Sequence, residues 1–166
     1  MPNEPQKFWN FSLQLYGTKG VAAACLELQD SYQLDVNLIL FCFWHGRAYG
    51  AIDQELLLKV IELSRKWGAH VVQPLRSARN WMKLNPHPND QFDSLRERIK
   101  ADELMAEKFQ TEQIAGLTKA FNEGRQCVFG NDDTGENIES LLAATGIERD
   151  KKITSALEII RSAIQG

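Results

Sequence analysis

The sequence predicts an all-α fold: a single, compact, bundle-like domain of about seven or eight helices. Apolar residues recur at helical spacing along the chain, and proline and glycine interrupt them at intervals that suit helices. The strand-like runs, Val71-Val72 and Cys127-Val128-Phe129, are too short to build a sheet. With 166 residues, 43% hydrophobic and 25% charged, the chain has the size and composition of one soluble domain.

The first three helices are predicted before residue 48. Apolar side chains at residues 5–16 cover more than a single stripe, so we expect this helix to be buried on more than one side. A second helix, over about residues 18–31, begins with Thr18 as its N-cap. Asp35 caps a third helix over residues 36–47, which is apolar almost all round and is the expected central helix.

The following helices are predicted from the residues at their ends. Asp53 caps a fourth helix, and Gly68 is predicted to stop it. Pro74 suits the first turn of a fifth helix that ends near Leu84, and residues 85–89 form the clearest break in the chain. Helical spacing then resumes, and the remaining elements are predicted at residues 92–121 (helical), 129–135 (a polar loop), 136–145 and 151–164 (helices).

Charge is distributed unevenly along the chain. The net charge of −3 does not favour nucleic acid or an anionic lipid surface as a partner. Residues 59–83, however, carry six basic side chains and one acidic one, between two segments of net negative charge. This basic band either neutralises the acidic segments or faces an external anion.

Arg76, Arg79 and Lys83 are the strongest candidate binding residues. Their spacing of three and then four residues places them on one face of a helix. Guanidinium groups offer paired planar donors, so this face could bind a phosphate, a carboxylate or an acidic partner surface. The alternative interpretation is that these side chains pair with acidic residues of neighbouring helices.

Asn37 is the candidate buried polar residue. It lies in the first turn of the apolar helix at residues 36–47, where a buried amide must find hydrogen-bond partners. We expect it either to fasten this helix to a neighbour or to contact a ligand.

Other polar residues have structural interpretations. Cys42 and His45 have a spacing that could suit a nucleophile and its base, or two metal ligands, but we interpret them as a core cysteine and a histidine at a helix end. Residues 131–136 lack the ligand pattern of a calcium loop and are interpreted as a polar turn. Asp102-Glu103 is interpreted as a solvated carboxylate pair. No metal or cofactor motif occurs, so none is predicted.

Cysteine usage and the N-terminal residues predict a cytoplasmic protein. The three cysteines are an odd number without a CxxC pair, which is typical of reduced thiols. The first seven residues have neither a basic start nor an apolar stretch for a signal peptide. The longest apolar run, Leu38–Trp44, has seven residues. A membrane span needs about 20, so none is expected.

Two blocks of sequence are familiar in combination. The first runs from Phe8-Trp9-Asn10-Phe11-Ser12-Leu13 through Asp35–Trp44, and the second joins Trp67 to Val71–Arg79. Together they resemble a family of uncharacterised bacterial proteins of similar length, a domain of unknown function. The resemblance covers about residues 8–85 and is weak over the acidic helical remainder, 86–166. It implies a bacterial cytosolic setting and no particular activity, and we treat residues 1–166 as one domain.

Three functions are compatible with these observations. The first is a non-enzymatic helical interaction or regulatory module with a protein partner. The second is a binder of, or an enzyme on, a small anionic or lipid-like ligand, using an aromatic pocket and an Arg76/Arg79 anion clamp. The third is a nucleic-acid-associated factor using residues 59–83, which the net charge disfavours. A homodimer is also expected, because the helices at residues 5–16 and 36–47 have surplus apolar surface.

Overall fold

The computed structural model describes residues 4–124 and 133–166, and every regular element within them is helical, which confirms the predicted all-α fold. The elements are α1 (Glu4–Tyr16), α2 (Val21–Tyr32), α3 (Val36–Ala48), α4 (Gln54–Trp67), the π-helix η1 (Gly68–Val72), α5 (Gln73–Leu84), α6 (Asp90–Asn122), α7 (Thr134–Thr145) and α8 (Lys151–Gln165). None of these helices is long and apolar enough to cross a membrane.

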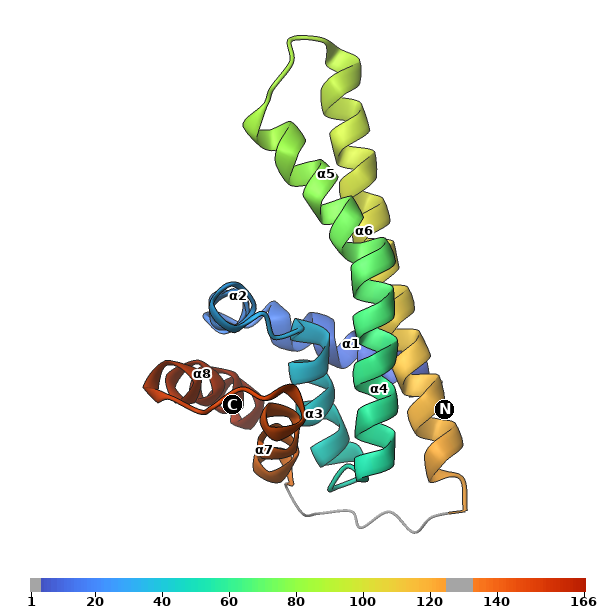
Figure 1. Ribbon diagram of the computed structural model, residues 1–166, viewed down its shortest axis with the longest axis vertical. Coiled ribbons are helices and arrows are strands. Elements are labelled where there is room, and N and C mark those ends of the chain that lie inside the picture. Colours follow the sequence, from blue (N-terminus) through green and yellow to red (C-terminus); the bar gives the residue numbers. More distant parts are fainter. Residues whose placement is uncertain (1–3, 125–132) are drawn as a thin grey trace.

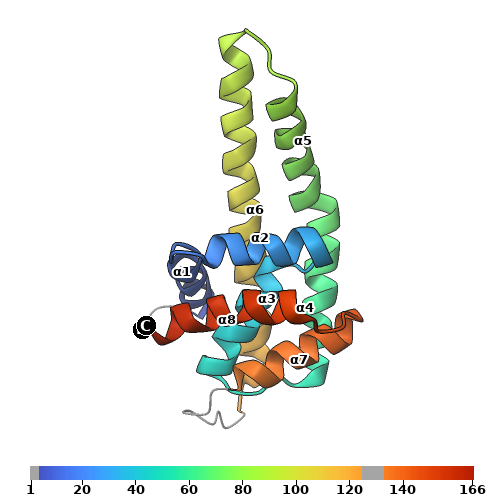
Figure 2. The same cartoon turned by 90° about the vertical axis from the view of Figure 1, so that its left-hand side faces the viewer.

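The helices form a body from which a two-helix hairpin projects (Figure 1). The body contains α1, α2, α3, α7 and α8, with α4 and the second half of α6 along one side. Beyond the body, α5 and the first half of α6 continue as an antiparallel pair, and the view in Figure 2 shows the same projection. We call residues 73–105 the projecting hairpin. The described part of the chain is therefore elongated, with one arm outside the bundle.

The core is built around α3, as its composition predicted. Every side chain from Leu38 to Trp44 is buried, and so is His45. The Phe8 ring of α1 stacks on Trp44 with 4.9 Å between ring centroids and meets Phe41 edge-on at 6.1 Å. The wide apolar surface of residues 5–16 and 36–47 is thus largely buried within one chain. The homodimer expected from that surface stays a prediction, to be checked by sedimentation of the purified protein.

The boundary between α1 and α2 differs from the prediction. Thr18 does not cap α2, because its Oγ1 donates instead to the Gln14 carbonyl oxygen at the end of α1, at 3.1 Å. The N-cap of α2 is Gly20, whose φ of 88° lies in the left-handed region that glycine adopts without strain. The caps predicted for α3 and α4 are confirmed: Asp35 accepts from the Asn37 N–H and Asp53 from the Glu55 N–H, each at 2.8 Å.

α4 ends at Trp67 with Gly68 as its C-cap, which is the predicted boundary, but the backbone does not leave the helical region there. Gly68 has φ −58° and ψ −49°, which is right-handed helical backbone, and the chain continues through η1 into α5. The wider π-helical turn comes directly before Gln73 and Pro74, where the missing proline N–H removes one bond from the α-helical ladder. Trp67 also holds this segment in place, since its Nε1 donates to the Ala106 carbonyl oxygen at 2.8 Å. A π-turn and a tertiary contact therefore carry the chain past the end of α4 in helical backbone.

The remaining elements agree with the predicted order. The segment predicted as a break, residues 85–89, joins α5 to α6, and helical spacing from residue 92 belongs to one helix of 33 residues. The last two helices begin at Thr134 and Lys151. Most of the polar loop predicted at residues 129–135, and Cys127, lie outside the described residues.

Candidate functional site

A polar network lies at the base of the projecting hairpin, where α5 and α6 meet the body. Three helices contribute to it: the start of α3, the first half of α5 and the middle of α6. All of the candidate residues named from the sequence except Lys83 belong to it. We call it the junction network, and its members are Asp35, Asn37, Arg76, Arg79, Glu103, Glu107 and Gln110.

The two arginines of the network bind carboxylates of α6. Arg76 donates from Nε to Glu103 Oε1 at 2.9 Å and from Nη2 to Glu107 Oε1 at 2.6 Å. Arg79 donates from Nε to Glu103 Oε2 at 2.5 Å and from Nη2 to Glu103 Oε1 at 3.3 Å. The Glu103 side chain is only 9% exposed, and the arginine side chains are 20% and 22% exposed. This is the internal pairing that the sequence offered as the alternative to an external anion.

The start of α3 is fastened to α6 by a cyclic set of hydrogen bonds. The Asn37 side chain donates from Nδ2 to Gln110 Oε1 at 3.1 Å. Gln110 in turn donates from Nε2 to Asp35 Oδ2 at 2.9 Å, while the other Asp35 oxygen caps the helix. Gln110 is 2% exposed, so both ends of its amide are satisfied inside the protein. The partner of the Asn37 amide is thus a side chain of a neighbouring helix.

The three carboxyl groups of the network have pKa shifts of different sign. Burial alone would raise the pKa of Glu103, but the hydrogen bonds and charges of Arg79 and Arg76 outweigh it and hold this pKa below its ordinary value. Burial raises the pKa of Glu107, and Arg76 offsets only part of that. Burial likewise raises the pKa of Asp35, against the hydrogen bonds from Gln110 and Asn37. Glu103 is therefore the carboxylate whose charge the arginines stabilise.

The sequence interpretation missed the acidic half of the network. Asp102-Glu103 was expected to be solvated, and this is wrong for Glu103, whose residue exposure is 7%. The available signal was spacing: Glu103, Glu107 and Gln110 recur at intervals of four and three on α6, as Arg76 and Arg79 do on α5. The neighbouring residues in the sequence do not show which distant helix will pack against Glu103, Glu107 and Gln110.

Lys83 lies apart from the junction network. It is exposed in the last turn of α5, near the far end of the projecting hairpin. Most of the basic band predicted at residues 59–83 has carboxylate partners within the chain: Lys59 pairs with Glu55, Arg65 and Lys66 pair with Glu62, and the two arginines of α5 pair as described. The band therefore neutralises acidic side chains of α4 and α6.

Cys42 and His45 lie in the core. The Cys42 thiol donates a hydrogen bond to the Asn137 carbonyl oxygen, with 3.6 Å between sulfur and oxygen. Burial raises the pKa of the Cys42 thiol. His45 Nδ1 lies 2.9 Å from the Gly50 carbonyl oxygen, and burial lowers the pKa of the ring. In residues 4–124 and 133–166, no group of three His, Cys, Asp or Glu side chains could hold a metal ion.

A pocket of about 510 Å³ opens on the body between α1, α3 and α8. Its walls combine apolar and aromatic side chains with polar groups, and the cation among its lining residues is Arg47. Arg76 and Arg79 do not line it, so this pocket lacks the arginine clamp that the sequence placed beside an aromatic pocket.

Comparison with known proteins gives one match. A family described as "Protein of unknown function (DUF2390)" matches residues 7–114, from α1 through most of α6. The matched range contains all seven residues of the junction network and the whole projecting hairpin. No curated protein and no solved structure matches the chain.

Proposed function

Because the chain belongs to this family of unknown function, we propose from its own geometry that it is a helical interaction module. Its docking surface is the far end of the projecting hairpin, and its partner is a protein segment that forms an amphipathic helix with acidic flanks. The junction network serves this function by fixing the hairpin on the body. The sequence features that predict reduced thiols and a bacterial resemblance support a place in the bacterial cytoplasm.

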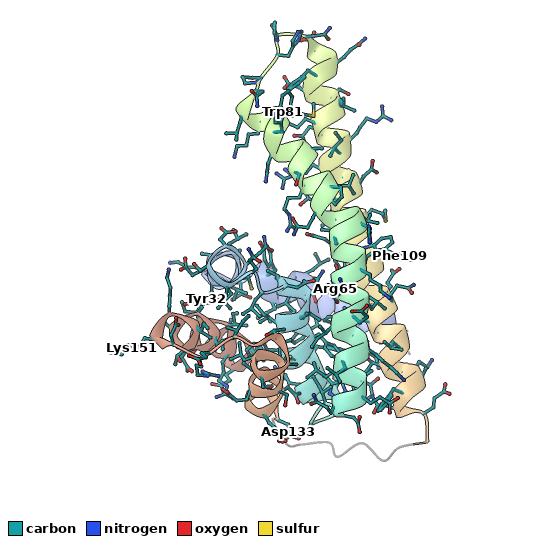
Figure 3. All side chains as sticks on the ribbon, viewed as in Figure 1. Tyr32, Arg65, Trp81, Phe109, Asp133 and Lys151 are labelled. Carbon is teal, nitrogen blue, oxygen red and sulfur yellow. The ribbon has the colours of Figure 1, made fainter. Side chains whose placement is uncertain are left out.

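The observation that carries this proposal is the exposure of large apolar side chains on an arm that packs on one side only. α5 packs against α6 and η1. On α5, Trp81 is 63% exposed and Leu84 is 80% exposed, and Leu95 on α6 is 49% exposed. Figure 3 shows Trp81 on the part of the hairpin that extends beyond the body. Tryptophan is enriched among the residues that dominate binding energy at protein interfaces.

Charge identifies the kind of partner. The segment from Gln73 to Asn89 contains three basic residues and no aspartate or glutamate. Arg76 and Arg79 are engaged by glutamates at the base of the hairpin, which leaves Lys83 as the α5 cation near its far end, in the same helical turn as Trp81 and Leu84. Exposed apolar side chains with a lysine in the same turn are complementary to an amphipathic helix with carboxylates along its edge, docked on the α5 side because Asp90 and Asp93 make the first turn of α6 acidic.

The junction network supports docking by setting the direction of the hairpin. The arginines join α5 to α6, and Gln110 joins α6 to the start of the buried helix α3. A rigid arm presents its side chains with less ordering on binding, which favours affinity. Arg76 and Arg79 therefore act on partner binding indirectly, whereas Lys83 acts in the interface.

Site-specific photo-crosslinking in the native host tests the proposal. A photoreactive amino acid replaces Trp81 or Leu84, and the control position is Ile159, which is 45% exposed on α8 of the body. The proposal expects one crosslinked protein from the hairpin positions and not from the control, with the crosslink in an acidic amphipathic segment. A synthetic peptide of that segment should then bind the purified protein and lose affinity at least tenfold to Lys83→Glu.

Three outcomes would overturn the proposal. One is crosslinking equal to that of the control position, which would show that the hairpin has no preferred partner. Another is a crosslink to a second copy of this chain, which would assign the surface to self-association. The third is a peptide whose affinity does not change with Lys83→Glu, which would remove charge complementarity as the basis of recognition.

A further inference from the structure

The pocket on the body lies on a surface away from the projecting hairpin. It is enclosed by the second half of α1, the end of α3 and the end of α8. Its volume of about 510 Å³ falls within the range of pockets that hold small molecules. Its apolar lining residues are Phe11, Leu15, Trp44, Ala48, Ala163 and Ile164.

The pocket has a fixed aromatic wall. Trp44 is 5% exposed and Leu15 is 4% exposed, so both are held in the core and present only an edge to the pocket. The Phe8 ring stacks on Trp44 with an interplanar angle of 27°, and Tyr49 meets Trp44 edge-on at 5.6 Å between ring centroids. Because these rings support one another, the wall is formed before any ligand arrives.

The polar groups of the pocket include one cation. Gln14, Thr18, Arg47 and the backbone of Gly166 line it together with the apolar residues. Arg47 donates from Nη1 to the Ile164 carbonyl oxygen at 3.3 Å, which anchors the guanidinium near the end of α8. Within residues 4–124 and 133–166, no carboxylate forms an ion pair with Arg47. A guanidinium has five N–H donors, so most remain for a ligand.

We propose that this pocket binds a medium-chain carboxylate of the fatty-acid class, with its chain against the Trp44 wall and its carboxylate on Arg47. An apolar lining selects an alkyl chain, and a guanidinium pairs with a carboxylate through two parallel hydrogen bonds. The volume of about 510 Å³ leaves room for a chain of medium length. The site is independent of the interaction surface on the hairpin.

Tryptophan fluorescence of the full chain provides the test. The probe is 11-bromoundecanoate, whose terminal bromine quenches a tryptophan that it touches, and the uncharged comparison is 11-bromoundecanol. The proposal expects saturable quenching by the carboxylate and about tenfold weaker binding of the alcohol, because a charge-assisted contact is lost. Quenching should be lost in Trp44→Phe, which removes the responding ring.

Variants of the cation and the wall separate the contributions. Arg47→Gln should weaken carboxylate binding about tenfold and leave alcohol binding unchanged, whereas Arg47→Lys should keep the preference for the carboxylate. Lys19→Gln makes the same change of charge one residue from Thr18 and is the matched control, with no effect expected. Ala163→Phe fills the pocket and should abolish binding of both probes, with an unchanged helical circular dichroism spectrum.

The proposal is overturned by any of three results. These are no saturable quenching, equal affinity of the carboxylate and the alcohol for the unmodified protein, and undiminished quenching in Trp44→Phe. If Arg47→Gln alters the circular dichroism spectrum, two other results decide the question. These are the preference of the unmodified protein for the carboxylate and the loss of carboxylate binding in Ala163→Phe.

Discussion

Arg79 on α5 and Glu103 on α6 face each other across the hairpin, with both carboxylate oxygens of Glu103 accepting from the Arg79 guanidinium. Arg76 donates to the same carboxylate. The Glu103 side chain is 9% exposed, so water cannot take the place of the hydrogen bonds and positive charge that these two arginines supply to its carboxylate. The geometry of the hairpin base thus depends on one buried carboxylate with two cationic partners.

The double variant Arg76→Gln/Arg79→Gln should therefore unfold more easily. It leaves Glu103 buried without a cation, and breaking a buried ion pair from one side costs about 3 kcal/mol or more. Urea denaturation at low and high salt measures this, and the loss should persist at high salt, because buried pairs are screened little. Lys83→Gln, at an exposed position outside the junction network, is the matched control and should change stability by less than about 0.5 kcal/mol.

The opposite result would change the assignment of the arginines. If the double variant kept its stability and lost partner binding, Arg76 and Arg79 would be direct binding residues, as the sequence alone allowed.

Stability should depend on pH through Glu103. The pKa of Glu103 is lowered in the folded protein, so its stabilising contribution is present above its ordinary unfolded value near 4.5 and is lost as pH falls through the folded value. We expect Glu103→Gln to destabilise the protein clearly at pH 7, and the difference from the unmodified protein to shrink as pH falls below about 4. Melting temperatures of both proteins between pH 3 and pH 7 check this. A difference that stays constant over this range would contradict the assignment.

Glu107 provides the contrast to Glu103. Burial raises the pKa of Glu107, so the folded protein favours its protonated form more than water does, and its contribution to stability falls as pH rises from about 4.5 through the folded value. Glutamine imitates the protonated carboxyl group. Glu107→Gln should therefore cost less stability at pH 7 than Glu103→Gln, although each loses a hydrogen bond from Arg76. Equal losses in the two variants would contradict the opposite signs of their pKa shifts.

The sequence was most informative where structure is local. Asp35 and Asp53 were identified as caps because an N-cap depends on a side chain and the backbone two or three residues later. Gly68 was identified as the end of the helix at α4, but the helical continuation through η1 was not, because it depends on the contact of Trp67 with α6. Glu103 was missed because its partners lie 24 and 27 residues away on another helix. The spacing of residues in the sequence shows that they share one face of a helix, but only the packing of the helices shows which residues cover that face.

The buried cysteines should be inert in the folded protein. Burial raises the pKa of Cys25 to about 12 and raises that of Cys42 as well, so neither forms a thiolate at neutral pH. In a Cys127→Ser background, an aromatic disulfide reagent should label no thiol until denaturant is added. Rapid labelling under native conditions would contradict the core position of these residues.

Cys42→Ala should cost stability without affecting binding. The thiol is buried and touches the Asn137 carbonyl group, so its removal leaves a small cavity and one weak hydrogen bond unmade. A loss of about 1 to 2 kcal/mol is expected from urea denaturation. The pocket does not include Cys42, so the affinity for 11-bromoundecanoate should be unchanged. A loss of binding with stability intact would assign this thiol a functional role.

Gly46 should be the glycine least tolerant of alanine among those in the described helices of the body. A Cβ at Gly46 would lie 2.8 Å from the backbone nitrogen and the Oγ1 of Thr134, at the start of α7, so α3 and α7 would have to separate. Overpacking of this kind costs about 1 to 3 kcal/mol.

Gly116, within α6, has no neighbouring atom within 4 Å of the corresponding position. Gly116→Ala should therefore stabilise the protein by roughly 0.5 to 1 kcal/mol through helix propensity. Urea denaturation of the two variants measures both signs, and a neutral Gly46→Ala would show that α7 is not held against α3 as closely as the structure places it.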